Sequence, residues 1–308
     1  MPLYTDLGLP EILLILEPYN ARPVSFRHLS GGAENSNYQV SLADRNDCVV
    51  SVLENMDVGA GTVRAGFLSS LNERGLPVPR LWSQRDGVVV RVHQEKPVIV
   101  SDYIVGTCYD VLPARFLGKS GRALARVHAV RDAEGLPPPY VRIGGTEFDI
   151  IQDFADRDFA DWLLTWREKT RYLVEDGQDD RVLTHGDFFA DNVIVTPTGE
   201  IVILDWENGA YDSYLLDLGM AVLGLAGEGT VFEPARARDF LGGYLDSESM
   251  PVPWGRLLDA VAYAAVFTAY HRYLKHEIND RTSGKQGSYR AIPELLVSTV
   301  ERWDLVAP

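Results

Sequence analysis

The strongest signal in the chain is the short stretch HGDFFADN, which runs from His185 to Asn192. Its H-x-D-x-x-x-x-N spacing suits phosphoryl transfer, in which one carboxylate orients the attacking hydroxyl and accepts its proton. An amide oxygen and a second carboxylate then hold Mg²⁺ against the phosphates, and such oxygen ligands suit Mg²⁺ and not zinc. We therefore expect Asp187 to be the catalytic base, with Asn192 and Asp205 as the Mg²⁺ ligands. The alternative is that all three are turn residues that cap local structure.

The segment after Asn192 explains how Asp205 could return to the same metal. Two short runs of β-forming residues, Val193–Thr196 and Ile201–Leu204, flank the turn Pro197–Gly199. This pattern predicts a tight hairpin that brings its two ends together.

The predicted secondary structure changes near Gly106. The first hundred residues predict strands interrupted by a helix at Val63–Arg74, whereas apolar residues recur at helical spacing from Arg115 onward. We expect an α+β, two-lobed fold, with a β-rich N-lobe over residues 1–103 and a mainly helical C-lobe over 104–308. Ligands favour clefts between such lobes.

These motifs resemble the aminoglycoside phosphotransferase/choline kinase superfamily, whose signature is H-G-D-x-x-x-x-N followed by I-D-W/F. Within it, the bacterial homoserine kinases are more similar, because the chain carries LSGGAENSNYQV at Leu29–Val40, RGLPVP at Arg74–Pro79 and LLDL at Leu215–Leu218. The resemblance implies a protein-kinase-like fold, ATP and Mg²⁺ as cofactors, and transfer of a phosphoryl group to a hydroxyl. It also implies that His185 and Asp217 support the catalytic loop.

The segment Gly31–Asn37 is the candidate for binding the ATP phosphates. Glycines allow backbone N–H groups to approach phosphates, and short polar side chains add donors. A short connector between the lobes is expected near Ser101–Gly106, and its first part, Ser101–Ile104, is where adenine would meet backbone groups. The candidate ATP-binding residues are Gly31, Gly32, Asn35, Ser36, Asn37, Ser51, Asp102 and Ile104.

The lysine that most kinases carry on the strand after this segment is absent, because Ser51 stands in its place. The homoserine kinase branch resembles this chain in lacking that lysine. The alternative is a pseudokinase that binds a nucleotide and acts through protein contacts.

The acceptor is less constrained by the sequence. Trp206-Glu207 and Leu223–Ala226 depart from the homoserine kinase pattern where the acceptor should bind. Glu207 resembles the acidic residue with which choline- and aminoglycoside-type kinases meet a substrate ammonium; Asp212 and Tyr270 are further candidates. We expect a hydroxylated amine or amino acid, with L-homoserine first and an aminoglycoside or an amino alcohol as the alternative.

Composition excludes several other classes. The net charge of −15 disfavours nucleic acid and anionic membranes as partners. No apolar run approaches the roughly 20 residues of a membrane span, and no basic segment at the N-terminus suggests a secretory signal. Two cysteines far apart suit a reducing cytoplasm, where we expect the protein. The sequence does not determine an oligomeric state.

Overall fold

The computed structural model describes residues 5–29, 35–84, 87–132, 134–138, 146–176, 181–247, 250–279 and 284–306. The chain forms two compact units, Met1–Gly106 with Val202–Leu204, and Thr107–Ile201 with Asp205–Pro308. The first is built around a sheet and the second is mainly helical, which confirms the α+β class expected from the sequence.

An antiparallel sheet in the order β1-β2-β3-β5-β4 forms the core of the N-terminal unit. Its strands are β1 (Pro23–His28), β2 (Asn35–Leu42), β3 (Cys48–Leu53), β4 (Val90–His93) and β5 (Lys96–Asp102). Successive side chains of a strand point to opposite faces, so the buried and half-buried positions that alternate along β2 belong to two different surfaces.

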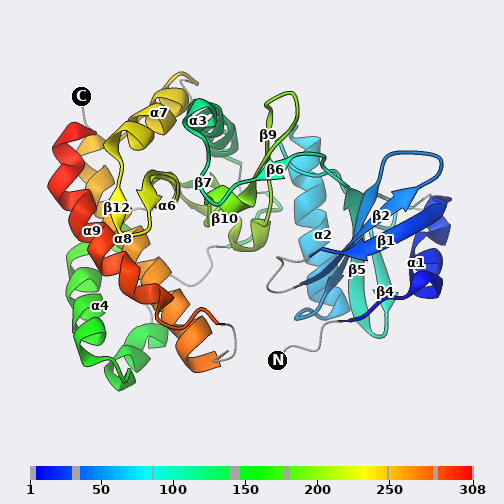
Figure 1. Ribbon diagram of the computed structural model, residues 1–308, viewed down its shortest axis with the longest axis horizontal. Helices are drawn as coiled ribbons and strands as arrows, with labels where there is room; N and C mark the ends of the chain where they lie inside the picture. The colour runs from blue at the N-terminus through cyan, green and yellow to red at the C-terminus, as the bar shows by residue number, and fades with distance from the viewer. Residues whose placement is uncertain are drawn as a thin grey trace. The chain divides into compact units, whose positions relative to one another are not determined.

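One helix covers each face of this sheet (Figure 1). Helix α1 (Leu9–Leu16) packs on the face that carries Tyr38 and Val50, and α2 (Val58–Glu73) packs on the face that carries Leu53. The sequence analysis missed α1, although Glu11 accepts a hydrogen bond from the N–H of Gly8, which begins the helix. It also started α2 five residues late, because the N-cap Asp57 was overlooked.

Helices dominate the C-terminal unit. They are α3 (Ala114–His128), α4 (Arg157–Thr170), α5 (Tyr172–Asp176), α6 (Tyr214–Ala226), α7 (Pro234–Leu245), α8 (Trp254–Tyr273) and α9 (Ala291–Arg302). The rest of the chain contains short strands: β6 (Thr107–Cys108), β7 (Arg181–Thr184), β8 (Val193–Val195), β10 (Ala210–Ser213), β11 (Gly227–Glu228) and β12 (Val231–Phe232) in this unit, and β9 (Ile201–Ile203), most of which belongs to the N-terminal unit. Helix α6 is buried on nearly all sides and packs against α7 and α8, as its almost wholly apolar sequence requires. None of the helices in the described part of the chain combines the length and apolar composition that a bilayer crossing needs.

A close helix crossing sets up the support of the site. Where α3 meets α7, a Cβ on Gly121 would lie 2.0 Å from the carbonyl oxygen of Phe240, so only glycine allows this approach. The crossing brings His128, at the end of α3, within 2.7 Å of the hydroxyl of Tyr244 on α7. Both side chains are fully buried.

Candidate active site

The candidate catalytic loop, His185–Asn192, follows β7, which pairs antiparallel with β10. At the start of the loop Gly186 has φ +81°, and a Cβ there would lie 2.7 Å from the carbonyl oxygen of Asn208. Glycine is therefore required by both conformation and space. The bend that it makes turns the next residue, Asp187, away from the strand.

Asp217 of α6 stabilises this bend through hydrogen bonds to the backbone. Its carboxylate is buried and accepts hydrogen bonds from the backbone N–H groups of His185 and Gly186, both at 2.7 Å, and from Nε2 of His128 at 2.9 Å. Burial alone would raise the pKa of Asp217, but the hydrogen bond from His128 and the backbone donor of His185 outweigh it and lower the pKa. The expectation that Asp217 supports the loop agrees with these contacts.

Asp187 and Asn192 lie together, as the motif predicts. The Nδ2 group of Asn192 donates to the backbone oxygen of Asp187 at 2.8 Å and to Oδ2 of its carboxylate at 3.0 Å. Burial raises the pKa of Asp187 to about 6; His185 opposes this shift, whereas the nearby carboxylates of Asp205 and Asp191 add to it. A carboxylate with a pKa just below neutral is suited to act as a base at neutral pH.

Asp205 has an uncommon backbone conformation. Its φ of 53° is in the left-handed region, which is uncommon for a residue other than glycine, and its side chain is exposed. No hydrogen bond or ion pair from the described residues reaches its carboxylate. The next residue, Trp206, is buried with its ring 4.9 Å from that of His185, which anchors the segment beside the catalytic loop.

The alternation of β2 and β3 separates the candidate ATP-binding residues of the N-terminal unit. Asn35 and Asn37 pair with Leu53 and Ser51 and share the α2 face with them, whereas Ser36 points to the α1 face and is buried. The Ser36 hydroxyl bonds to Glu54, so its side chain is engaged within the protein. Gly31 and Gly32 lie outside the described residues.

In the connector, the N–H of Asp102 donates to the carbonyl of Arg80 at 2.9 Å. The Asp102 carboxylate accepts from Nε1 of Trp82 at 2.6 Å. The N–H of Ile104, by contrast, has no partner among the described residues.

The three candidate acceptor residues differ in their surroundings. Glu207 is half-buried in the turn that follows Asp205, and Asp212 on β10 lines a cavity of about 60 Å³ beneath Gly186. The ring of Tyr270 is buried on α8, where it lies 6.0 Å from that of Phe154 in an aromatic cluster. Tyr270 therefore presents little surface to a ligand.

Two features of the C-terminal unit were missed by the sequence analysis. Arg272, in the last turn of α8, has the carboxylates of Asp191 and Asp187 as its charged neighbours. Its signal is an arginine that follows a largely apolar stretch of this helix. The second is a cavity of about 440 Å³, within the size range of ligand pockets, lined by Asp153, Phe154, Ala155, Tyr273, Glu277, Ile278 and Gln286.

The fold and this loop define a kinase-type phosphotransferase. The sequence matches the phosphotransferase enzyme family over residues 25–256, and the chain belongs to that family. It is therefore a small-molecule kinase, an ATP-dependent phosphotransferase whose acceptor is an alcohol group, as the resemblance predicted.

Individual relatives and structures agree with this assignment. Homoserine kinase from Pseudomonas aeruginosa (strain LESB58) is 28% identical, with 79% of each chain covered. Homoserine kinase from Acidiphilium cryptum (strain JF-5) is 23% identical over 82% of this chain and 84% of the relative. Spectinomycin phosphotransferase in complex with ADP and spectinomycin shares the fold at a TM-score of 0.69 and 15% identity, covering 94% of both chains. Choline kinase from Streptococcus pneumoniae does so at 0.64 and 17%, covering 93% of this chain and 98% of the other.

Proposed function

We propose that the protein transfers the γ-phosphoryl group of ATP to the side-chain hydroxyl of an amino acid, with L-homoserine as the leading acceptor. The observation that carries the reaction type is the arrangement of Asp187 and Asn192 on a loop fixed by Asp217. The homoserine kinases at 23–28% identity support the acceptor.

Asp187 is the proposed base. Because Asn192 occupies its Oδ2 atom, Oδ1 is the atom that accepts the proton of the acceptor hydroxyl. The acceptor oxygen then forms a bond to the γ-phosphorus as the bond from that phosphorus to the bridging oxygen of ADP breaks. The fixed backbone of the loop holds the carboxylate in place, so positioning supplies most of the rate enhancement.

The donor set fits Mg²⁺. Since Asn192 uses its Nδ2 group to bind Asp187, its Oδ1 atom is left as a ligand, and the Asp205 carboxylate is exposed and unpaired among the described residues. We propose these two side chains as the Mg²⁺ ligands. Bound there with ATP, Mg²⁺ would offset phosphate charge. No group of three or more acidic, His or Cys side chains suited to a metal occurs in the described ranges, so a separate metal cage is not proposed.

For the nucleotide, we propose the α2-face side chains Asn35, Asn37 and Ser51 as phosphate contacts. We propose the carbonyl of Asp102 and the N–H of Ile104 as the adenine contact. Gly31 and Gly32 stay predictions from the sequence. Ser36 is not retained as a direct contact, because its hydroxyl lies on the opposite face of the sheet.

The proposed amino-acid class rests on opposite charges in the C-terminal unit. Glu207 and Asp212 are the candidates for the substrate ammonium. Arg272 is the candidate for the carboxylate: burial lowers the pKa of its guanidinium, which Asp191 and Asp187 oppose. Arg272 makes one long hydrogen bond within the described residues, 3.5 Å to the carbonyl of Ser288, and no ion pair there. Its remaining donors are available to a carboxylate.

An aminoglycoside or amino-alcohol acceptor is the alternative. The cavity of about 440 Å³ favours it, because two of its lining residues, Asp153 and Glu277, are acidic and suit a cationic ligand. A nucleotide-binding pseudokinase is the third possibility and is motivated by Ser51 in the lysine position.

The test is ATP turnover with Mg²⁺ against L-homoserine, 3-amino-1-propanol and an aminoglycoside panel. The amino alcohol is homoserine without its carboxylate, so it isolates the role of Arg272. We expect Arg272→Met to raise the KM for homoserine about tenfold or more and to leave the KM for the amino alcohol unchanged. Only homoserine has a carboxylate that can pair with a guanidinium. Equal losses on both acceptors would exclude carboxylate binding by Arg272.

Two controls identify the reaction itself. Asp187→Asn should abolish turnover on every acceptor. Turnover of an aminoglycoside without turnover of homoserine would transfer the proposal to the alternative acceptor class. Nucleotide binding with no turnover on any acceptor would favour the pseudokinase.

A further inference from the structure

The N-terminal unit contains a lysine–glutamate ion pair, but it is not the pair that kinases use at the phosphates. Glu54 follows β3 and Lys96 begins β5, and Lys96 binds Oε2 of Glu54. Both belong to the α1 face, because they alternate in step with Val52 and Val98 of the α1-side core. Ser51, in the place of the usual lysine, is on the other face.

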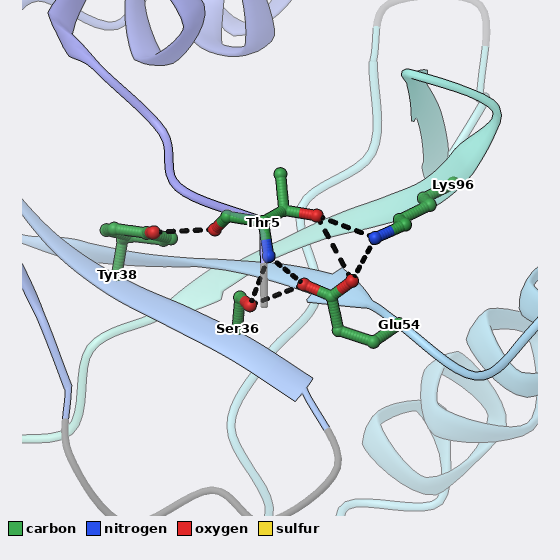
Figure 2. A network of polar contacts seen from close by, with 5 residues as sticks. All are labelled: Thr5, Ser36, Tyr38, Glu54 and Lys96. Atoms are coloured by element: carbon green, nitrogen blue, oxygen red, sulfur yellow. Dashed lines mark hydrogen bonds and ion pairs between the residues drawn. The ribbon is translucent and has the colours of Figure 1, made fainter. Parts of the chain in front are cut away.

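Glu54 collects donors from three separate segments (Figure 2). Its Oε1 atom accepts from the N–H of Thr5 at 2.7 Å and from the hydroxyl of Ser36. Its Oε2 atom accepts from Lys96 and from Oγ1 of Thr5 at 3.1 Å, and Lys96 also donates to that Oγ1 at 3.0 Å. The Glu54 side chain is only 2% exposed. Burial would raise its pKa, but these donors lower it, so Glu54 is ionised at neutral pH.

The N-terminal segment is bound to β2 through the same cluster. The N–H of Thr5 also lies 3.1 Å from Oγ of Ser36. Tyr38, two residues along β2, donates its hydroxyl to the carbonyl of Thr5 at 2.7 Å and accepts from the N–H of Leu7 at 3.1 Å. The first residues of β2 are thus clamped between the N-terminal segment and Glu54.

We propose that Glu54 is a positioning residue for the nucleotide: by fixing Ser36 from the α1 face, it sets the orientation of Asn35 and Asn37 on the α2 face. Residues on either side of a strand position cannot reorient independently of it, because their side chains alternate along one rigid backbone. This inference rests on the proposed function, in which Asn35 and Asn37 contact the phosphates.

The test measures the Kd for ADP with Mg²⁺ by calorimetry on the full chain, together with thermal melts. We expect Glu54→Gln to raise this Kd about tenfold, because the amide loses the ion pair with Lys96 and turns an N–H donor toward Thr5 or Ser36. Ser36→Ala removes one arm of the cluster and should raise Kd by about threefold. The double variant should bind ADP no more weakly than Glu54→Gln alone, since both changes interrupt one connection.

A matched control separates positioning from general stability. Asp156 caps α4 in the C-terminal unit and, like Glu54, accepts several hydrogen bonds: from the N–H of Phe159, from the hydroxyl of Tyr289 and from the guanidinium of Arg290. Asp156→Asn should lower Tm without changing the Kd for ADP. If Glu54→Gln lowers Tm in the same way and leaves Kd within about twofold of wild type, the positioning role is refuted.

The design keeps the two proposals distinguishable. In turnover assays, Glu54→Gln should raise KM for ATP and leave KM for the acceptor unchanged. If wild type binds ADP but phosphorylates no acceptor, the proposed reaction fails while the Kd comparison still tests Glu54. A wild type that binds no nucleotide contradicts both. Should Glu54→Gln fail to fold, an unchanged Kd in Ser36→Ala would by itself overturn the inference.

Discussion

Replacing Asp217 by Asn tests whether the buried carboxylate under the catalytic loop is the element that holds it. The carboxylate accepts two backbone N–H groups at 2.7 Å and Nε2 of His128 at 2.9 Å, and is only 3% exposed. An amide can keep its oxygen toward His185 and His128, but its NH₂ group then faces the N–H of Gly186. Two buried donors are left facing each other.

The expected cost follows from those contacts. A hydrogen bond to a charged group contributes about 1.5–3 kcal/mol, and a buried unsatisfied donor costs about 1–3 kcal/mol. Relief of the buried charge offsets part of this, so we expect a loss of about 3 kcal/mol in the free energy of unfolding. At about 2–4 °C per kcal/mol for a unit of this size, Tm should fall by about 6–12 °C.

The assay is a thermal melt at neutral pH beside a turnover measurement. Asp246→Asn is the control, because Asp246 also binds a basic side chain, that of Arg122, but the two side chains are 67% and 49% exposed. It should change the free energy of unfolding by less than about 1 kcal/mol. We expect kcat of Asp217→Asn to fall as well, since the loop carrying Asp187 loses an anchor. A drop in Tm no larger than that of the control would refute the reasoning.

Four further predictions concern the loop itself. Asp187→Ala should lower kcat by about 10²–10⁴-fold, and a loss below about tenfold would remove Asp187 from the role of base. Because the pKa of Asp187 is raised to about 6, kcat/KM should be constant above pH 6. It should fall as the pH drops through 6, since the base becomes protonated. A kcat/KM that stays constant down to about pH 4.5 would contradict the assignment of Asp187 as the base. The same raised pKa means that the ionised side chain of Asp187 destabilises the fold at neutral pH. Asp187→Asn should therefore raise the free energy of unfolding by about 1–3 kcal/mol, and raise Tm with it, while abolishing turnover. An unchanged or lower Tm would contradict the idea that the buried carboxylate is destabilising. Gly186→Ala should lower both Tm and kcat, because its Cβ would lie 2.7 Å from Asn208 and its φ of +81° is unfavourable for alanine; retained stability with normal kcat would show that the bend is not required.

Local sequence was sufficient where an element carries its own signal. The run Cys48–Leu53, rich in β-forming residues, predicts a strand with the bounds that β3 has, and the sequence predicts helices from Pro234 and Trp254, where α7 and α8 begin. Both helices start next to a proline, which suits the first turn of a helix and gives a sharp signal. Helix α1 was missed because its one-sided apolar pattern is short and resembles a buried strand.

The surroundings of several candidate binding residues could not be predicted from the sequence. Asn35, Ser36 and Asn37 are equivalent as letters, but the pleat of β2 places Ser36 on the opposite face from its neighbours. Tyr270 is a plausible ligand residue by composition, and its burial in an aromatic cluster depends on packing by α4 and the segment around Phe154. Arg272 was overlooked because it interacts with the charge of Asp187 in space although the two residues are far apart in the sequence.

The sequence by itself determined the reaction type, because phosphoryl transfer needs a carboxylate, an amide and a second carboxylate at short spacing, and His185–Asn192 with Asp205 encodes them locally. Only the tertiary structure decided how that chemistry is supported: which carboxylate is buried beneath the loop, which charged groups shift the pKa of Asp187, and on which face of the sheet Glu54 and Lys96 meet. Burial and electrostatic fields arise from residues that are distant in the chain and adjacent in space, so no local pattern can specify them.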